Sequence, residues 1–345
     1  MKVAVLTVQV PFVRGGAELL ADWLTENLRE HGHEVELVRL PFRWNPPRAV
    51  LDHMLAARLT RVRPADRVIA TKFPAYVVPH ENKVVWLLHQ FRPVYELWGT
   101  PHQGLEDGHE AARVREAVMA VDNAYLPEAK AIYTNSRVTS TRLRNFNGLD
   151  SKILYPPLRD PASFRCESYG DYVFFPSRIT SSKRQELLVQ ALAHTRSGVR
   201  AVIAGAGDLP EHVDSLRDLI DREGLGERIE LIPAWISEER KLELYANALA
   251  VVYPPLDEDS YGYVTMESFY ARKPVLTCTD SGGTLELVED QVTGRVVAPS
   301  PVALAEALDE LAGEPALAER LGERARRRLD ELDVSWETVV ETLTS

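Results

Sequence analysis

Two carboxylates eight residues apart mark the stretch PPLDEDSYGYVTMESF, residues 254–269. Asp259 precedes a Tyr-Gly-Tyr turn, and Glu267 lies inside an apolar pattern that predicts a helix from about residue 264 to residue 272. A glycine at the start of a helix lets a ligand approach the unpaired backbone N–H groups there. The carboxylates could therefore bracket an elongated polyhydroxy ligand, with a phosphate on the amides between them. The alternative is a solvated acidic loop followed by a helix-start glutamate.

Three cations gather at a second junction, FPSRITSSKRQELL, residues 175–188. We expect Ser181 or Ser182 to cap a helix, with Lys183 and Arg184 in its first turn and Arg178 just before it. Each cation at a helix N-terminus costs a few tenths to about 1 kcal/mol, because that end carries partial positive charge. A bound anion would make the contribution of these cations to stability favourable. The pattern therefore favours a phosphate site that uses Arg178 and Lys183 over cations that only reach solvent.

Glycines mark three further junctions where a predicted strand ends. These are Gly15 and Gly16 in VPFVRGGAELL, Gly205 in IAGAGDLP, and Gly282 and Gly283 in TDSGGTLELVED. Gly205 is followed by Gly207, but Pro210 stands where the third glycine of a dinucleotide fingerprint is needed. Each glycine pair is also compatible with ordinary turn chemistry.

The segment VVWLLHQFRPVYELWGTPHQG, residues 84–104, ends a predicted buried strand at His89. A histidine at the C-terminal end of a strand could face a ligand, although a lone histidine is about as often a structural hydrogen-bonding group. Arg92, Tyr95 and Trp98 follow in the loop. Aromatic rings there could stack on a sugar, while packing inside the domain is their default role.

Length and composition indicate a globular protein of two domains, because 345 residues exceed one ordinary core of about 150 residues. Hydrophobic residues make up 45% and charged residues 26%, which excludes a disordered or membrane-spanning chain. Cys166 and Cys278 have no metal-ligand or disulfide spacing, so no metal site is expected. The P-loop, HExxH and GxSxG motifs are absent, which disfavours P-loop kinase, zincin and α/β-hydrolase chemistry.

The net charge is −11 and is unevenly distributed. Residues 1–160 hold 21 Lys and Arg against 18 Asp and Glu, and the remaining residues hold 19 against 33. The acidic total argues against nucleic-acid binding, while the mildly basic first part favours an anionic acceptor or weak association with a membrane surface. We interpret MKVAVLTVQVPF as a buried first strand and not as a signal peptide, because its apolar run is short and lacks a cleavage site. We expect a cytoplasmic protein, peripheral at the inner membrane face if it contacts a membrane.

Apolar runs alternate with helical patterns along the chain, which is the βαβ signature of parallel sheets covered on both faces. The expected strands include KVAVLTV, HEVELVRL, DRVIATK, NKVVWLLH, KAIYTNS, DYVFFPSR, RAVIAG, RIELIP, ALAVVYP and PVLTC. A Pro-rich linker over residues 155–170 separates two such series, so the fold class is α/β, with doubly wound domains over residues 1–157 and 165–333. Ligands of such sheets bind beyond the C-terminal ends of the strands. The last segment, residues 335–345, could pack back on the first domain or remain a frayed tail.

Taken together, these motifs resemble one known family. DSYGYVTMESFYARKPVLTCTDSGGTLELV is similar to the signature region of retaining GT-B glycosyltransferases of family 4, written E-x7-E and followed by a Pro-Val strand, a Gly-Gly turn and a Glu. SRITSSKRQELLVQAL resembles that family's Arg and Lys diphosphate clamp, RGGAE its Gly-rich loop, and SWETVVETL its crossover helix. The motifs follow the expected order over nearly the whole chain. The resemblance implies two Rossmann-like domains that face a cleft, the first binding the acceptor and the second the donor.

The resemblance also implies roles for individual residues. Arg178 and Lys183 would bind the donor diphosphate, Glu267 the ribose hydroxyls, and Asp259 the hydroxyls of the transferred sugar. The remaining donor-site positions would be Gly15, Gly16, Gly205, Trp235, Ile236, Tyr261, Gly262, Tyr263, Val264, Gly282 and Gly283. The first domain would contact the sugar or the acceptor through His89, Arg92, Tyr95 and Trp98.

The implied reaction transfers a sugar from a UDP- or GDP-linked donor to a glycan, a lipid-linked acceptor or a small molecule, with retention of configuration. No metal, cofactor or enzyme nucleophile would take part, because the leaving phosphate would accept the acceptor's proton. The protein would then contribute positioning and electrostatic stabilisation. Two positions depart from the family pattern. Asp259 replaces its first Glu, with Glu258 beside it as a substitute, and PAW replaces Leu-Gly in the base loop.

Other classes of function stay open on the sequence alone. The shortened Asp259 would suit a protein that binds a nucleotide sugar without turnover. An epimerase or a phosphorylase could use the same fold. A nicotinamide oxidoreductase is disfavoured by the broken glycine fingerprint. The donor sugar, the base, the acceptor, the linkage and the oligomeric state stay open as well.

Overall fold

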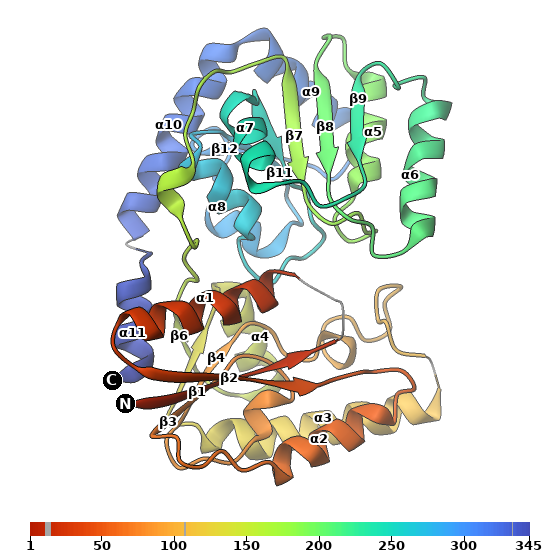
Figure 1. Ribbon diagram of the computed structural model, residues 1–345. Coiled ribbons are helices and arrows are strands. Elements are labelled where there is room, and N and C mark those ends of the chain that lie inside the picture. Colours follow the sequence, from red (N-terminus) through yellow and green to blue (C-terminus); the bar gives the residue numbers. More distant parts are fainter. Residues whose placement is uncertain (11–14, 107, 333) are drawn as a thin grey trace. The chain divides into compact units, whose positions relative to one another are not determined.

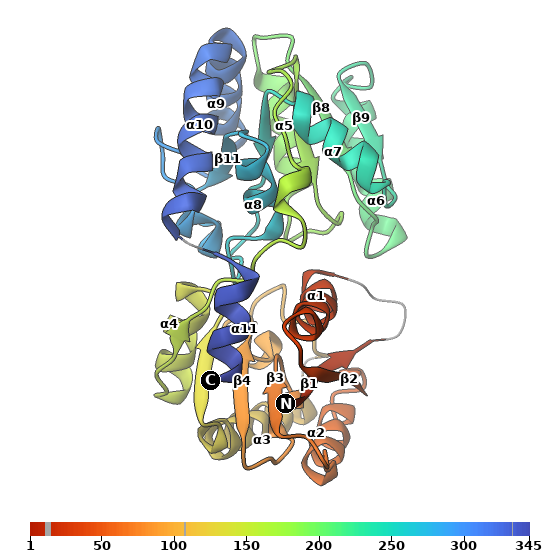
Figure 2. The same cartoon turned by 60° about the vertical axis from the view of Figure 1, so that its left-hand side comes forward.

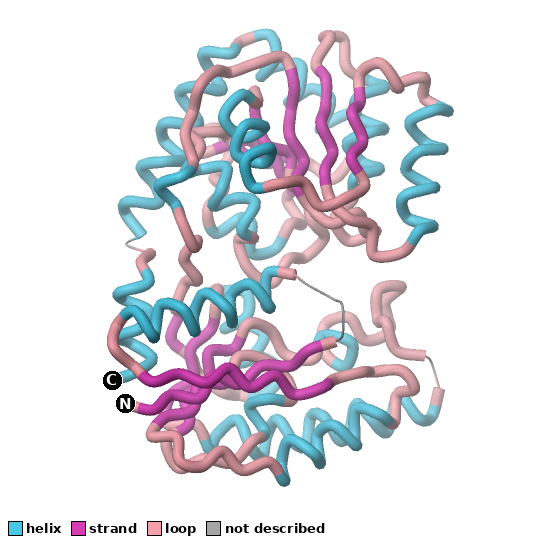
Figure 3. Tube along the Cα trace, in the orientation of Figure 1, coloured by secondary structure: helices cyan, strands magenta, loops and turns pink. Residues whose placement is uncertain are grey.

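The computed structural model describes residues 1–10, 15–106, 108–332 and 334–345 (Figure 1). The chain divides into unit 1, residues 1–157 and 334–345, and unit 2, residues 158–333. Each unit contains a six-stranded parallel sheet with helices packed around it (Figure 3). The predicted α/β class with two parallel sheets is therefore confirmed.

Unit 1 has the strand order β2-β1-β3-β4-β5-β6. Its strands are β1 Lys2–Gln9, β2 Glu34–Pro41, β3 Arg67–Ala70, β4 Lys83–Leu87, β5 Ala131–Thr134 and β6 Lys152–Ile153. Its α-helices are α1 Gly16–Glu30, α2 Ala49–Leu59, α3 His109–Tyr125, α4 Arg137–Asn147 and α11 Trp336–Thr344. Both faces of β1 are apolar and buried, because Val3 and Val5 belong to one core cluster and Ala4 and Leu6 to the other.

The closing helix α11 packs on unit 1, which decides between the two alternatives for the last segment. Its Val339, Val340 and Leu343 belong to the same core cluster as Leu20 and Leu24 of α1. Figure 2 shows α11 and α1 on one face of the sheet. The guanidinium of Arg67 donates to the carbonyl oxygens of Leu343 and Ser345 over 2.8 Å each. The C-terminal helix is therefore part of the core of unit 1.

Unit 2 has the strand order β12-β11-β10-β7-β8-β9. Its strands are β7 Tyr172–Pro176, β8 Arg200–Ala204, β9 Ile229–Ile232, β10 Ala250–Val252, β11 Val275–Cys278 and β12 Gly294–Val297. Its α-helices are α5 Gln185–His194, α6 Pro210–Arg222, α7 Glu238–Asn247, α8 Tyr263–Tyr270, α9 Pro301–Gly313 and α10 Pro315–Leu332. β12 was not expected from the sequence, because it is an edge strand with a mostly half-buried pattern.

The Pro-rich passage belongs to unit 2 from Leu158 onward, not from residue 165. The ring of Phe164 meets the ring of Tyr245 edge-on, with the centroids 5.6 Å apart. The backbone N–H of Glu167 donates to the Ala246 carbonyl over 2.9 Å. The second half of this passage is therefore anchored to α7.

The strand order of unit 2 reverses between β7 and β10. From β7 the chain continues outward to β8 and β9, and the second series starts on the other side of β7 with β10. Where the order reverses, the loops after the two neighbouring strands diverge and leave room for a ligand at their C-terminal ends. The loops after β7 and β10 are those that carry the cations and carboxylates singled out from the sequence.

Candidate functional site

The loop after β7, residues 177–184, carries three cations, Arg178, Lys183 and Arg184. The end of β8 packs so closely against the loop that a Cβ on Gly205 would lie 2.1 Å from the Ser177 carbonyl oxygen. Glycine is required there. α5 begins only at Gln185, since Arg184 has a left-handed backbone with φ 60°. The prediction that Ser181 or Ser182 caps this helix is therefore wrong, and Lys183 and Arg184 lie in the loop before it.

The ammonium group of Lys183 is held by two side chains that follow β10. Its Nζ contacts the carboxylate of Glu258 and donates to the hydroxyl of Tyr253 over 3.0 Å. The side chains of Lys183 and Glu258 are 15% and 21% exposed. Burial opposes the charged form of the lysine, but the nearby Glu258 carboxylate outweighs it, so the pKa of Lys183 is raised. A charged lysine therefore joins the loops after β7 and β10.

The start of α8 lies beside the same tyrosine. Gly262 precedes the helix with φ 70° and ψ 138°. A Cβ on Gly262 would lie 2.7 Å from Cε1 of Tyr253 and 2.9 Å from its hydroxyl oxygen. The helix runs over Tyr263–Tyr270, near the predicted range of 264–272. The structure thus makes neighbours of a charged lysine and a helix N-terminus, two anion-binding features that the sequence indicated separately.

Arg184 anchors the start of the acidic loop, residues 254–260, through hydrogen bonds. Its guanidinium donates to both carboxylate oxygens of Asp280 over 2.8 and 2.7 Å. It also donates to the carbonyl oxygens of Pro254 and Pro255 over 2.6 and 3.0 Å. These bonds satisfy the guanidinium fork in a bidentate pair. Arg184 is therefore a structural residue, in contrast to Lys183 next to it.

The glycine pair Gly282-Gly283 packs against the backbone of the acidic loop. A Cβ on Gly282 would lie 2.5 Å from the carbonyl oxygen of Glu258. One on Gly283 would lie 2.5 Å from the carbonyl carbon of Ser260. The N–H of Gly283 donates to the Glu258 carbonyl over 2.8 Å. The glycines therefore position residues 257–260 by close backbone approach.

Glu267 lies in the second turn of α8, and α7 supplies its partners. Its Oε1 accepts a hydrogen bond from Lys241 Nζ and its Oε2 accepts one from the Tyr245 hydroxyl, each over 2.8 Å. Burial disfavours the ammonium of Lys241, but Glu267 outweighs this effect, and the pKa of Lys241 is raised. Each carboxylate oxygen can accept a further bond, so the group can still bind sugar hydroxyls. Sequence reasoning missed Lys241 and Tyr245, whose i, i+4 spacing was the available signal.

Arg178 and Asp259 occupy more open positions. Arg178 pairs with Asp208 over 2.7 Å, and these side chains are 38% and 39% exposed. Such an exposed pair contributes about 0–1 kcal/mol to the stability of the fold, so an incoming anion can compete for the guanidinium at little cost. Asp259 is half-buried and lies two residues before Tyr261, whose side chain is in the core.

The segment between β9 and α7 presents an aromatic surface. Trp235 is 66% exposed, and Ile236 beside it is half-buried. Ser237 then caps α7 by accepting a bond from the N–H of Arg240 over 3.2 Å. An exposed indole fixed just before a capped helix is suited to stacking on a planar ring.

In unit 1 the start of α1 is bound by a side chain of the helix itself. The N–H of Gly15 donates to Glu18 Oε2 over 2.9 Å, and Glu18 Oε1 accepts from Lys72 Nζ over 2.6 Å. Gly16 is exposed at the first position of α1. Arg14, the first residue of the predicted Gly-rich loop RGGAE, lies outside the described residues.

The loop after β4 contains half-buried side chains and one core side chain among the predicted contact residues. His89 is half-buried, with Nδ1 2.7 Å from the Gln90 carbonyl oxygen. Arg92 donates to Glu96 over 2.5 Å, and the half-buried Trp98 has the guanidinium of Arg115 5.0 Å from its ring centroid. Tyr95 is only 3% exposed, so its ring belongs to the core, as the packing alternative stated.

A buried carboxylate explains why Tyr95 lies inside. The hydroxyls of Tyr76 and Tyr95 donate to the two oxygens of Asp122 over 2.9 and 2.7 Å. Burial raises the pKa of Asp122 to about 7, although both hydrogen bonds oppose the shift. This group is an element of the core of unit 1.

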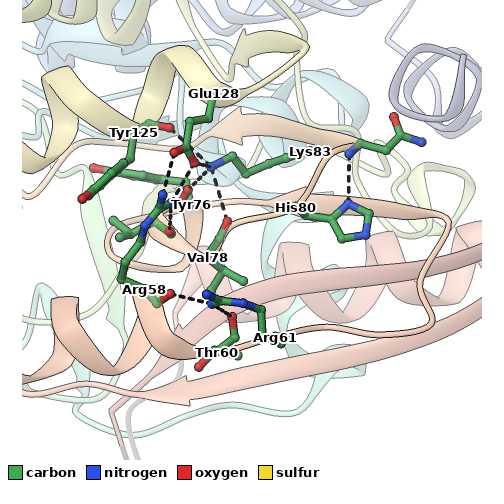
Figure 4. Close-up of polar contacts among 11 residues, drawn as sticks. Arg58, Thr60, Arg61, Tyr76, Val78, His80, Lys83, Tyr125 and Glu128 are labelled. Carbon is green, nitrogen blue, oxygen red and sulfur yellow. Dashed lines mark hydrogen bonds and ion pairs between the residues drawn. The ribbon is translucent and has the colours of Figure 1, made fainter.

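Lys83 forms a second buried cation site at the first residue of β4, whereas His89 follows the other end of that strand. Its Nζ donates to the carbonyl oxygens of Tyr76, Val78 and Tyr125 and to Glu128, over 2.8 to 3.3 Å (Figure 4). Arg58 pairs with the same carboxylate over 2.8 Å. Burial lowers the pKa of Lys83, although Glu128 opposes the shift. Every ammonium hydrogen has a protein acceptor, so the cluster is structural.

Within the described ranges, no three His, Cys, Asp or Glu side chains gather as a metal site. The helices that the structure describes include none long and apolar enough to cross a membrane.

The two doubly wound units define a GT-B fold, and solved structures of that fold match the chain over nearly its full length. The Anabaena protein Alr3699/HepE, solved with UDP and glucose, matches with a TM-score of 0.74 and 20% identity, covering 100% of this chain and 99% of that one. Sucrose-phosphate synthase from Thermosynechococcus elongatus matches with a TM-score of 0.78 and 19% identity, covering 99% and 97%. These similarities establish the fold class.

Residues 162–328, which make up most of unit 2, match the family described as glycosyl transferases group 1. Human alpha-1,3/1,6-mannosyltransferase ALG2 is 27% identical over 230 residues, which is 59% of this chain and 55% of the relative. Alpha-maltose-1-phosphate synthase of Mycobacterium tuberculosis (strain CDC 1551 / Oshkosh) is 29% identical over 253 residues, or 67% and 62%. The matches thus span 55% and 62% of the length of these curated relatives.

Proposed function

We propose that the protein is a retaining glycosyltransferase that moves a sugar from a nucleoside-diphosphate sugar to an acceptor hydroxyl without a metal ion. The observation that carries the proposal is the contact of Lys183 with Tyr253, whose hydroxyl lies beside Gly262 at the start of α8. A diphosphate at this point would interact with a charged lysine and with the positive end of the α8 dipole together. The group 1 family match of unit 2 and the named activities of its relatives support the same class.

In the proposed reaction the protein positions the donor and stabilises charge. Lys183 and the start of α8 stabilise the negative charge that grows on the diphosphate as the glycosidic bond breaks. Glu267, held by Lys241 and Tyr245, accepts hydrogen bonds from the ribose. Asp259 accepts them from the transferred sugar, and the leaving phosphate oxygen takes the proton of the acceptor hydroxyl. Holding both substrates in one geometry supplies the rest of the acceleration.

The donor is proposed to be UDP- or GDP-linked, and the acceptor a carbohydrate or a lipid-linked molecule. The complex of Alr3699/HepE, a protein of the same fold, with UDP and glucose supports the proposal of a UDP- or GDP-linked donor. Trp235 is the proposed stacking surface for the base, because its ring is exposed next to the start of α7.

A weak, peripheral association with the inner face of a membrane is part of the proposal. Leu55 and Leu59 lie one turn apart on α2 and are 60% and 66% exposed. Arg61 and Arg63 follow directly and are exposed as well. Apolar side chains flanked by cations are suited to an anionic lipid surface.

The test is calorimetric titration of the protein with UDP, GDP, ADP, dTDP and NAD in the presence of EDTA. We expect one nucleoside diphosphate to bind, and Lys183→Met to weaken its binding by about 10- to 100-fold, the value of a hydrogen bond to a charged group. Arg217→Met is the control, since Arg217 is 53% exposed on α6. Binding of NAD alone, or equal affinity of the wild type and Lys183→Met, would refute the proposal.

A further inference from the structure

We propose that Glu258 is a displaceable counter-ion that occupies Lys183 until the diphosphate of a donor takes its place, and that it thereby sets donor affinity. The inference rests on the proposed function, since it concerns the same lysine. Glu258 contacts the ammonium of Lys183, the group proposed to bind the diphosphate. A carboxylate and a diphosphate carry charge of the same sign, so they compete for that ammonium.

The contacts of Glu258 restrict any movement to its side chain. The N–H of Gly283 donates to its carbonyl oxygen over 2.8 Å. Gly282 packs so closely that an added Cβ would lie 2.6 Å from the backbone nitrogen of Glu258. The backbone of Glu258 is therefore held at its nitrogen and its carbonyl oxygen, while its side chain is 21% exposed and the carboxylate can turn toward water. Exchange of ligands on Lys183 then needs a rotamer change of one side chain and no loop opening.

Tyr253 keeps the lysine in place during this exchange. Its hydroxyl lies 3.0 Å from Lys183 Nζ and 3.3 Å from the carboxylate of Glu258. Tyr253 itself is 3% exposed, so its position is set by packing. An ammonium has three donors, and the contacts with Glu258 and Tyr253 use two of them. Lys183 can therefore stay on Tyr253 while phosphate oxygens replace Glu258.

The arrangement has a consequence for selectivity. With Glu258 in place the pair is neutral, so a small anion that offers only charge must displace a partly buried carboxylate. A nucleotide sugar gains further bonds at Glu267 and along α8, which offset this cost. Inorganic phosphate and pyrophosphate lack those bonds. Glu258 would thus weaken the binding of simple phosphates and of complete donors by the same factor, so that only ligands with these additional bonds keep a useful affinity.

The test measures dissociation constants of UDP, GDP and inorganic pyrophosphate for the wild type, Glu258→Gln and the control Glu289→Gln. Glu289→Gln removes the same charge from an exposed position of unit 2. We expect Glu258→Gln to bind the nucleoside diphosphate and pyrophosphate about tenfold more tightly. A neutral glutamine amide bonds the Lys183 ammonium about half as strongly as a carboxylate does, so the ligand displaces it at a lower cost. The control should bind like the wild type.

Unchanged or weaker binding by a folded Glu258→Gln, with the wild type still binding a nucleoside diphosphate, overturns this inference alone. Failure of every protein to bind any nucleoside diphosphate overturns the proposed function and the inference with it. Glu258→Asp is the second variant, for the case in which the glutamine variant does not fold. It keeps the charge but shortens the reach, so it should bind more tightly than the wild type, and equal or lower affinity overturns the inference.

Discussion

Replacing Gly262 by alanine should destabilise unit 2 and at the same time disturb Lys183. The backbone at Gly262 has φ 70° and ψ 138°, a region that residues with a Cβ avoid, and holding alanine there costs of order 1–3 kcal/mol. The new Cβ would also lie 2.7 Å from Cε1 of Tyr253. Relief of such overlap costs a further 1–3 kcal/mol or so, because the tyrosine is buried. We therefore expect Gly262→Ala to lower the free energy of unfolding by about 2–6 kcal/mol.

Urea unfolding followed by circular dichroism measures this loss. The control is Gly313→Ala at the end of α9, where nothing lies within 4 Å of an added Cβ. This variant should match the wild type within about 0.5 kcal/mol or gain slightly from the better helix former. Adding Tyr253→Leu to Gly262→Ala removes the ring that the new Cβ overlaps. The double variant should therefore regain the part of the unfolding free energy that the overlap costs, and a double-mutant cycle measures this part as a coupling energy. If Gly262→Ala unfolded within about 0.5 kcal/mol of the wild type, the reasoning on this contact would be refuted.

Two further predictions concern unit 1. Because the pKa of Asp122 is raised from 3.8 to about 7, its contribution to stability is greatest below about pH 4 and falls by up to about 4 kcal/mol as the pH rises to 7. Asp122→Asn should flatten this fall in urea midpoints between about pH 4 and 8, and an equally steep fall in the variant would contradict the assignment. Leu55→Glu with Leu59→Glu should abolish sedimentation with anionic vesicles, whereas Val302→Glu, at a position 54% exposed in unit 2, should not. Equal sedimentation of both would exclude α2 as the contact.

Local sequence patterns predicted the architecture of this protein. Strands such as β1, β4 and β7 are continuous apolar runs, because both faces of a parallel sheet are buried. The start of α8 was predictable from Gly262, and the presence of a cation near α5 from Lys183. β12 was missed because an edge strand buries little on one side, so its sequence lacks the strong apolar signal.

Several partners of the site were not predictable, because they join positions far apart in the sequence. Lys183 meets Glu258 across 75 residues, and Arg184 meets Asp280 across 96. The second contact moves the start of α5 to Gln185, which local capping rules placed earlier. Glu267 in turn finds Lys241 and Tyr245 on another helix.

The sequence by itself determined the two doubly wound sheets, the order of the motifs and the residue types available for binding a diphosphate. Periodicity and turn chemistry act over a few neighbouring residues, so a single chain displays them without its fold. Only the tertiary structure decided which groups each of the two neighbouring cations contacts. Lys183 contacts Glu258 and Tyr253 near the start of α8, whereas Arg184 beside it donates to Asp280 and two carbonyl groups. Neighbouring residues of like charge thus differ in role because the strand order brings different loops against each of them.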